Sequence, residues 1–271
     1  MIKALPVVPD TWRRAGSAVA VIGLGKSGVA VTRLLAREGL RVYASDASDH
    51  PYAGAAADAL KGVPGVEVEY GRHDLNKIRH ATGVVVSPGV PPDAPVLAAA
   101  RHAGVAIVSE LDIGFRALAA RGGTRSIAIT GTNGKTTTTA LVAHLLSAAG
   151  LRATTAGNIG RPLTDLAMAD EQYQWLSLEV SSFQLHDSPN FAPEIGIMTN
   201  LAPDHLDRYP SAEAYYADKR LLFRNASAGD VWVLNADDTL VLQLAQGVAG
   251  RRVLFSLVQG SDAWYDRAQS T

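Results

Sequence analysis

The chain has 271 residues, which is long enough for two α/β domains that each have their own core. Its 25 Lys and Arg nearly balance its 26 Asp and Glu, so the charge gives no reason to expect a nucleic-acid or membrane partner. The absence of Cys excludes disulfides, thiolate zinc sites and a Cys nucleophile, and oxygen ligands would favour Mg²⁺. No apolar run approaches the roughly 20 residues of a membrane span, and we expect a cytoplasmic monomer.

Strands and helices alternate through the first half of the chain. Residues 18–22 predict a strand that enters Gly23-Leu24-Gly25-Lys26-Ser27-Gly28 and then a helix ending near Gly39. A second strand, 40–45, ends at Asp46, roughly 20 residues after Gly28, where dinucleotide-binding folds place an acidic residue on the ribose. Further strands are predicted at 67–70, 83–87 and 106–108, and a helix at 96–103. This alternation predicts a Rossmann-like, doubly wound, mostly parallel sheet in a first domain of residues 1–121.

The segment 127–137 predicts a buried strand, a Gly-rich turn and the start of a helix that runs over 136–149. In such an arrangement the turn N–H groups and the positive end of the helix face an anion, Lys135 reaches the β- and γ-phosphates, and the Thr136 hydroxyl ligates Mg²⁺. The usual spacing has Gly at position 129, where this chain has Ile129. We interpret the segment as a nucleoside triphosphate site, and an ordinary strand–helix turn is the alternative.

The second region, residues 122–271, continues the alternation. Strands are predicted at 175–180, 195–199, 231–235 and 253–255. The chain ends soon after the last of these without a closing helix. We therefore expect an incomplete ATP-binding α/β domain of the P-loop type.

Polar residues follow several strands of this region. Glu179, at the end of the strand 175–180, suits a Mg²⁺ ligand beside a phosphate loop, and a solvated loop glutamate is the alternative. The segment 200–209 contains His205, two Asp and an Arg within five residues. A cluster of this kind at a strand end is more typical of function than a single core histidine.

Two further polar features carry weaker signals. Lys219 lies four residues after Tyr215 on the predicted helix 212–223, and this spacing alone predicts only a solvated helix lysine. Asn235-Ala236-Asp237-Asp238 predicts an Asx turn before it predicts a site.

The chain therefore contains two loops of nucleotide-binding type. The pattern of Gly23, Gly25 and Gly28 is a weak signal by itself, and its usual interpretation is an NAD-dependent oxidoreductase, which leaves the second loop unexplained. A nucleotide-bearing substrate on one loop and ATP on the other explain both. The segment 87–90 (Ser-Pro-Gly-Val) follows a strand and supports a site on the first domain, with an ordinary Pro-Gly turn as the alternative.

With these motifs the chain resembles the Mur ligase family over essentially its whole length. The segments that carry the resemblance occur in family order: 130–136 (TGTNGKT), 157–160 (GNIG), 178–185 (LEVSSFQL), 204–209 (DHLDRY) and 235–238 (NADD). The short first domain, with Gly23-Leu24-Gly25 and Ser87-Pro88-Gly89, is most similar to that of the members that add glutamate. Ala47 and Ser48 stand where many relatives have Thr and Arg.

The resemblance implies a role for each matching residue. Substrate binding falls to Gly23, Gly25, Lys26, Ser27, Asp46, Ser87, Pro88, Gly89, Asn158, Ser181 and Gln184. ATP binding falls to Gly131, Thr132, Asn133, Gly134, Lys135, Thr136 and Thr137. Two Mg²⁺ ions would be bound by Thr136, Glu179, His205 and Lys219, with Lys219 carbamylated. Lys135, Lys219 and His205 are the implied catalytic residues.

The implied activity is ATP-dependent amide formation in peptidoglycan precursor synthesis. ATP would phosphorylate the carboxylate of UDP-N-acetylmuramoyl-L-alanine, and the amine of glutamate would attack the acyl phosphate. Mg²⁺ and Lys135 would offset the repulsion between carboxylate and γ-phosphate. A relative that uses L-glutamate instead of D-glutamate is an alternative.

Family members have three domains, and this chain reaches only into the second. We therefore expect the chain to be a fragment without the C-terminal domain of the family, which is on the order of 150–200 residues. We expect the chain to bind the UDP-sugar better than ATP and to show little or no turnover alone. A nucleotide-binding fragment without catalysis is the alternative description of this polypeptide.

Overall fold

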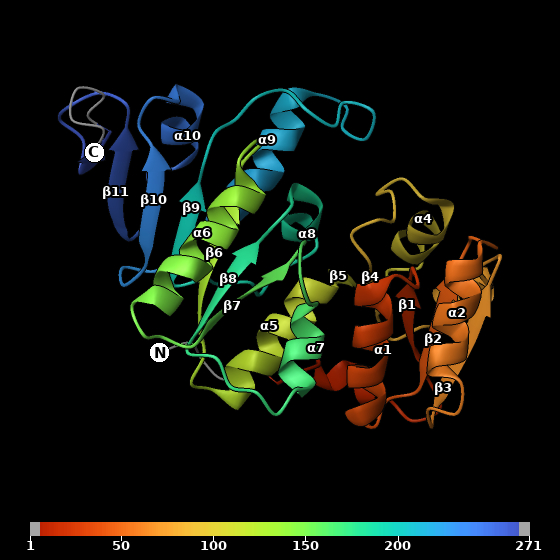
Figure 1. The fold of residues 1–271 in the computed structure, drawn as a ribbon. Coiled ribbons are helices and arrows are strands. Elements are labelled where there is room, and N and C mark those ends of the chain that lie inside the picture. The colour runs from red at the N-terminus through yellow and green to blue at the C-terminus, as the bar shows by residue number, and fades with distance from the viewer. Residues whose placement is uncertain (1–5, 266–271) are drawn as a thin grey trace. The chain divides into compact units, whose positions relative to one another are not determined.

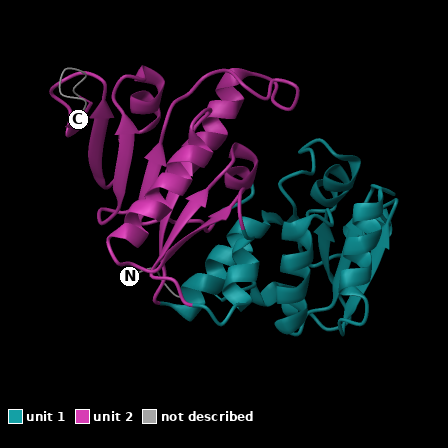
Figure 2. Ribbon diagram, viewed as in Figure 1, with its two compact units in different colours: residues 1–122, 161–171, 187–189 teal, residues 123–160, 172–186, 190–271 magenta. Residues whose placement is uncertain are grey.

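The computed structural model describes residues 6–265 and divides into two compact units. Unit 1 comprises residues 1–122, 161–171 and 187–189, and unit 2 comprises residues 123–160, 172–186 and 190–271 (Figures 1 and 2). Two short segments from the second half of the chain therefore belong to unit 1. Both units contain parallel sheets flanked by helices, which confirms the predicted α/β class.

Unit 1 is built on a five-stranded parallel sheet with the strand order β3-β2-β1-β4-β5. Its strands are β1 (Val19–Ile22), β2 (Val42–Asp46), β3 (Val66–Tyr70), β4 (Val84–Val86) and β5 (Ile107–Ser109). Its helices are η1 (Asp10–Arg13), α1 (Lys26–Arg37), α2 (Pro51–Leu60), α3 (Leu75–Arg79), α4 (Pro95–His102), α5 (Glu110–Arg121) and α7 (Leu163–Met168). The strand order changes direction between β1 and β4, and open α/β sheets bind ligands outside the carboxyl ends of the strands at such a point.

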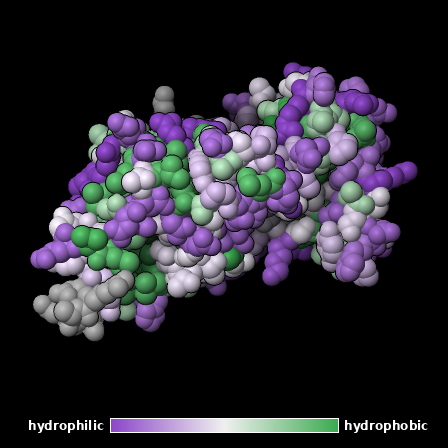
Figure 3. Space-filling model, turned by 90° about the horizontal axis from the view of Figure 1, so that it is seen from above, coloured by the Kyte–Doolittle hydropathy of each residue, from purple (hydrophilic) through white to green (hydrophobic). Residues whose placement is uncertain are grey.

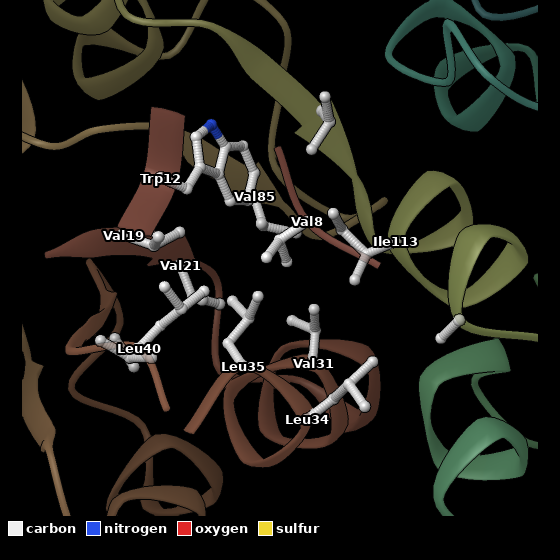
Figure 4. Packing of buried hydrophobic residues seen from close by; sticks show 14 of the residues in the cluster. Val8, Trp12, Val19, Val21, Val31, Leu34, Leu35, Leu40, Val85 and Ile113 are labelled. Carbon is white, nitrogen blue, oxygen red and sulfur yellow. The ribbon is translucent and has the colours of Figure 1, made fainter. Parts of the chain in front are cut away.

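The core of unit 1 explains why its central strands are apolar runs without alternation. All four residues of β1 are buried because side chains on both faces of the sheet pack against helices. On one face Val19, Val21 and Val85 contact the buried side of α1, together with Trp12 and Val8 from the segment before β1 (Figure 4). On the other face Ala20 and Ile22 belong to a second cluster with α3 and α4.

Helix α5 was not predicted from the sequence, and its burial explains the omission. Nine of its residues, Glu110 to Leu118, are buried, so it lacks the polar face that reveals an amphipathic helix. Its Gly114 allows close contact with α7, since a Cβ there would lie 2.4 Å from the Leu163 Cβ. The start of α5 could be recognised in the sequence, because Ser109 is a typical N-cap residue, and its side chain accepts the Asp112 N–H.

Glu110, the first residue of α5, holds α7 through a buried carboxylate. Its Oε1 accepts both the N–H and the hydroxyl of Thr164, each at 2.7 Å. Its Oε2 has no hydrogen-bond partner, and the side chain is 1% exposed. Burial, opposed by the Thr164 bonds, raises the pKa of Glu110 from 4.5 to about 7.

We expect this carboxyl to make unit 1 less stable as pH rises. Between pH 4.5 and about 7 the folded state binds more protons than the unfolded state, so this contribution to stability falls through that window. Glu110→Gln should be more stable than the wild type at pH 8, by about 1–3 kcal/mol, and similar to it at pH 5. Urea unfolding at both pH values measures the difference. Glu67→Gln, at an exposed ion pair, is the control, and an equal difference at both pH values for Glu110→Gln would contradict the prediction.

Unit 2 is built on a seven-stranded sheet with the order β12-β11-β10-β9-β6-β8-β7, and its strand pairs are parallel. Its strands are β6 (Arg125–Thr130), β7 (Ala153–Gly157), β8 (Trp175–Glu179), β9 (Ile195–Met198), β10 (Val231–Asn235), β11 (Arg251–Ser256) and β12 (Ala263–Trp264). Its helices are α6 (Lys135–Ala148), α8 (Ser182–His186), α9 (Ala212–Arg220), η2 (Leu221–Phe223) and α10 (Thr239–Leu244). Helix α6 runs along the face formed by β6, β8 and β7 (Figure 1).

One face of the molecule shows mainly polar side chains. The face shown in Figure 3 is largely hydrophilic, with apolar side chains interspersed among the polar ones. Among residues 6–265, none of the helices has the length and apolar character needed to cross a membrane.

Candidate functional site

The two units carry separate groups of predicted site residues. In unit 1 the turn between β1 and α1 depends on two glycines. Gly23 has a φ of 93°, and a Cβ at Gly28 would lie 1.8 Å from the Gly23 carbonyl oxygen. Gly25 is the N-cap of α1 and has no neighbouring atom within 4 Å of an added Cβ. Gly23 and Gly28 therefore permit the close contact between the turn and the start of α1. Gly25 leaves the backbone accessible to a ligand.

Asp46 and Ser87 hold this turn from the neighbouring strands. Asp46 Oδ2 accepts the Leu24 N–H at 2.8 Å, and its Oδ1 accepts the Ser48 N–H at 2.9 Å. The Ser87 hydroxyl donates to the Gly23 carbonyl at 3.1 Å. The structure thus brings the three loops after β1, β2 and β4 together at one edge of the sheet.

The other predicted residues of unit 1 surround this turn. Lys26 and Gly89 are exposed, and Ser27 and Pro88 are half-buried. Lys26, Ser27 and Gly28 form the first turn of α1, whose N–H groups have no acceptor within the helix. This end of α1, with an ammonium beside it, can bind a phosphate or diphosphate group.

In unit 2 the phosphate loop connects β6 to α6. Gly131 has a φ of 142°, and a Cβ there would lie 2.0 Å from the Thr199 Oγ1. Gly134, with a φ of 80°, is the left-handed N-cap of α6. Both positions require glycine. The loop has this shape even though Ile129 stands where the usual spacing has its first glycine.

The segment after β9 stabilises the phosphate loop through hydrogen bonds. These contacts were not predicted from the sequence. Thr132 N–H donates to the Asn200 carbonyl at 2.8 Å, and Asn133 N–H donates to the Asn200 side chain at 2.9 Å. The Asn133 carbonyl accepts from the Thr199 hydroxyl at 2.7 Å. The signal available in the sequence was that Thr199 and Asn200 end a strand of the same parallel sheet, since the carboxyl ends of such strands share one edge.

Two lysines donate to one carbonyl of the loop. Lys219 Nζ lies 2.7 Å from the Gly131 oxygen, and Lys135 Nζ lies 3.1 Å from the same oxygen and 2.7 Å from that of Thr132. Lys219 is 1% exposed, and its Nζ lies 4.5 Å from the centre of the Tyr215 ring. Its spacing predicted a solvated helix lysine, so its burial is a property of the fold.

The environment of Lys219 disfavours an ammonium. Burial, followed by the nearby charge of Lys135, lowers the pKa of Lys219 from 10.5 to about 7, and Asp204 opposes the shift. A neutral amine at this position is therefore accessible near neutral pH, which is the state in which lysine acts as a nucleophile or base.

Glu179 joins the start of α6 to the loop after β7. Its Oε2 accepts the Thr136 hydroxyl at 2.7 Å, and its Oε1 accepts the Asn158 amide at 2.8 Å. Gly157 permits this approach, since a Cβ there would lie 2.3 Å from the Glu179 carbonyl oxygen. Glu179 is 3% exposed, which excludes the solvated loop glutamate considered above.

His205 lies in an exposed turn against aromatic rings. Its φ of 53° is the only positive value for a non-glycine residue among the described ones, and the Asp204 carboxylate accepts its N–H at 2.8 Å. Its ring centre is 5.4 Å from that of Phe183 and 5.9 Å from that of Tyr215. Aromatic contacts and a left-handed backbone together limit the directions in which this imidazole can point.

The remaining predicted residues of unit 2 have local roles in the structure. The Ser181 hydroxyl donates to the Gln184 Oε1 at 3.0 Å and accepts the Gln184 N–H at 3.2 Å. Gln184 is 1% exposed. Thr137 and Asn133 are exposed at the start of α6 and in the loop.

The donor set beside the loop suits Mg²⁺ bound together with a phosphate. Thr136 and Glu179 supply a hydroxyl and a carboxylate, which are hard oxygen ligands. Among the described residues no group of three or more His, Asp or Glu could hold a metal ion alone. This agrees with Mg²⁺ sites that use one or two protein ligands and complete their coordination with substrate phosphates and water.

Comparisons with known proteins agree with this geometry. Residues 129–271 match the family model described as Mur ligase middle domain, and residues 17–109 match the one described as Mur ligase MurD-like, N-terminal domain. A UDP-N-acetylmuramoylalanine--D-glutamate ligase from Frankia casuarinae is 44% identical over 243 residues, which cover 90% of this chain and 50% of that protein. The protein with the same name from Gloeobacter violaceus is 46% identical over 222 residues, 82% of this chain and 49% of the relative. The chain thus spans about half the length of these curated relatives.

Solved structures share the fold. A UDP-N-acetylmuramate:L-alanyl-gamma-D-glutamyl-meso-diaminopimelate ligase from Neisseria meningitides matches with a TM-score of 0.58 and 19% identity over 89% of this chain and 78% of that chain. A UDP-N-acetylmuramate-alanine ligase from Thermotoga maritima matches with a TM-score of 0.50 and 25% identity over 90% and 53%. Since the middle-domain match alone covers more than half of its residues, the chain belongs to the Mur ligase family.

Proposed function

We propose that the chain forms the UDP-sugar-binding and ATP-binding parts of a ligase that adds D-glutamate to UDP-N-acetylmuramoyl-L-alanine in peptidoglycan precursor synthesis. The observation that carries this proposal lies in unit 2, where a phosphate loop, a buried carboxylate and a buried lysine converge. The name shared by relatives at 44% and 46% identity supports the substrate and the D-enantiomer. An L-glutamate-adding enzyme is the second candidate, which incubation of the complete enzyme with each enantiomer would distinguish.

Unit 1 would bind the UDP-sugar at the carboxyl edge of its sheet. The first turn of α1, with Lys26 and Ser27, would bind the diphosphate, and the loops of Asp46 and Ser87 would hold the turn in place. In unit 2, Ser181 and Gln184 would line the muramoyl-alanine part of the substrate, and Asn158, whose amide donates to Glu179, would contact its diphosphate-sugar region.

The loop residues of unit 2 from Gly131 to Thr137 would bind the phosphates of ATP. Lys135 would leave the loop carbonyls and contact the β- and γ-phosphates, while Thr136 and Glu179 would hold Mg²⁺. Bound there, Mg²⁺ would neutralise the charge that develops during phosphoryl transfer to the alanine carboxylate. His205 would ligate a second ion. Lys219, if carbamylated, would present oxygens to the ions instead of a repelling ammonium.

This 271-residue chain should bind its ligands with little or no turnover. The relatives are about twice as long, and the part of them outside the match would contribute to glutamate binding and to closure over ATP. Robust amide formation by the chain alone would contradict this expectation. The enzyme is expected to act as a cytoplasmic monomer.

Calorimetric titration tests the proposal on the chain as it exists. UDP-N-acetylmuramoyl-L-alanine should bind saturably, and a non-hydrolysable ATP analogue should bind only with Mg²⁺. Lys135→Ala should abolish binding of the analogue and leave binding of the UDP-sugar unchanged, because the proposal places Lys135 on the phosphates of ATP and not on the UDP-sugar. If the wild type binds the ATP analogue but no UDP-sugar, the proposed role of unit 1 is wrong.

A further inference from the structure

The carboxylate of Asp46 is already engaged by the backbone of unit 1. Its two oxygens accept the N–H groups of Leu24 and Ser48 at 2.8 and 2.9 Å. Since these bonds join the loop after β1 to the loop after β2, Asp46 fixes the two loops relative to each other. The next two residues along the chain, Ala47 and Ser48, have side chains too small to cover a planar group.

Tyr52 is a large side chain that contacts this carboxylate. Its hydroxyl lies 3.4 and 3.5 Å from the two Asp46 oxygens, and its ring centre is 5.4 Å from that of His50, with an angle of 36° between the rings. It is the second residue of α2, and the His50 side chain accepts its N–H. Tyr52 is nevertheless 49% exposed. The ring is thus held at its hydroxyl end and on its His50 side while about half of its surface faces solvent.

The position of Tyr52 matches that of a nucleoside bound to this sheet. A diphosphate on the first turn of α1 lies at the switch point between β1 and β4, and the attached ribose extends toward the acidic residue that ends β2. β2 is the direct neighbour of β1, with Ser45 paired to Ile22. The base would then lie beyond Asp46, on the side where α2 begins with Pro51 and Tyr52.

We propose that Tyr52 is a stacking residue for the base of the uridine diphosphate sugar. This inference rests on the proposed function of unit 1 and adds a residue that contacts the pyrimidine base of the substrate. An aromatic ring offers a face to any base, and stacking is sequence-tolerant, so Tyr52 supplies affinity while selectivity for uracil comes from polar groups. The hydroxyl contact with Asp46 orients the ring, which reduces the conformational entropy lost on binding.

Titration with UDP as the probe tests the inference. Tyr52→Ala should weaken UDP binding by about tenfold to a hundredfold, the range for loss of one stacked base. Tyr52→Phe should retain most of the affinity because it keeps the ring. Tyr265→Ala is the control, because Tyr265 is 47% exposed and belongs to unit 2, whereas Tyr70 is paired with Asp46 in the sheet and contacts α2. Its affinity should equal that of the wild type.

A spectroscopic readout separates stacking from a structural effect. On the wild type and Tyr52→Phe, the uracil H5 and H6 proton resonances of UDP should shift upfield through the ring current, and on Tyr52→Ala this shift should be lost. Wild-type affinity and an unchanged upfield shift for Tyr52→Ala would overturn the role of Tyr52 while leaving the proposed function intact. Absence of UDP binding by the wild type would overturn both. Equal urea unfolding transitions of all variants verify that unit 1, which carries Tyr52, is folded.

Discussion

Replacing Lys219 by Met is expected to stabilise the ligand-free chain at pH 7 by a few kcal/mol, on the order of 2–4. Lys219 is 1% exposed, and burial with the charge of Lys135 lowers its pKa to about 7. At pH 7 folding must therefore remove about half of the charge that this lysine carries in the unfolded chain. Met has a similar length and no charge, and Lys135 still donates to the Gly131 carbonyl that loses its bond from Lys219.

The pH dependence identifies the cause of this gain. Between pH 7 and 10.5 the folded wild type binds fewer protons than the unfolded chain, so its stability rises with pH through this window. Lys219→Met lacks the group, and its advantage should shrink toward zero near pH 10. Urea unfolding at pH 7 and 10 measures both effects, in buffer free of CO₂ and divalent metals so that the lysine stays unmodified.

The control for Lys219 is Lys61→Met, which replaces an exposed lysine and should change the stability little at either pH. A Lys219→Met chain that is less stable than the wild type at pH 7 would contradict the prediction, since it would mean that the bond to Gly131 outweighs desolvation. If the gain is found, Lys219 lowers the stability of the ligand-free chain, as is typical of a residue that is retained for its chemistry and not for folding.

The largest loss of stability is expected for Gly28→Ala, at about 3 kcal/mol or more. The new Cβ would lie 1.8 Å from the Gly23 carbonyl oxygen and 3.1 Å from the Ser87 Oγ, so the start of α1 must move away from β1. The nearer neighbour is backbone, and the Ser87 hydroxyl is held by its hydrogen bond to the same Gly23 carbonyl. Urea unfolding measures the loss.

Gly25→Ala is the matched variant with the opposite expected result. A Cβ at Gly25 has no neighbour within 4 Å, and its backbone, with a φ of −67°, suits any residue, so the stability should change by less than about 1 kcal/mol. The same Cβ would occupy the space over the first turn of α1, and binding of a diphosphate should weaken at least about tenfold. Equal stabilities of the two variants would show that the glycines do not have these separate roles.

Much of the fold could be predicted from the sequence because its signals are local. The apolar runs at β1, β4 and β8 predicted buried parallel strands, and the alternation with helices predicted the α/β class. Helix α5 was missed because it is buried on all sides. β7, with the residues Ala-Thr-Thr-Ala-Gly, has no apolar run, and only pairing with β8 makes it a strand.

The candidate site divides in the same way. The phosphate loop is a contiguous segment whose glycines and N-terminal helix turn are determined by neighbouring residues, so its chemistry could be inferred before its structure. Spacing alone left Lys219 and Glu179 with a solvated alternative, because burial depends on residues far away in the sequence. Lys219 donates to the carbonyl of Gly131, and Glu179 accepts from Thr136. Both pairs are far apart in the sequence and come together only when the sheet packs.

The sequence by itself determined the class of fold, the phosphate loop and the family to which the chain is similar, because glycine conformations, strand patterns and contiguous motifs depend on short-range interactions. Only the tertiary structure decided which polar groups are desolvated and what they contact. It brought the carboxylate of Glu110 against Thr164, occupied Asp46 with two backbone N–H groups, and placed two lysines on one carbonyl. The physical reason is that burial, and with it the pKa of a side chain, is a property of the surroundings that folding assembles.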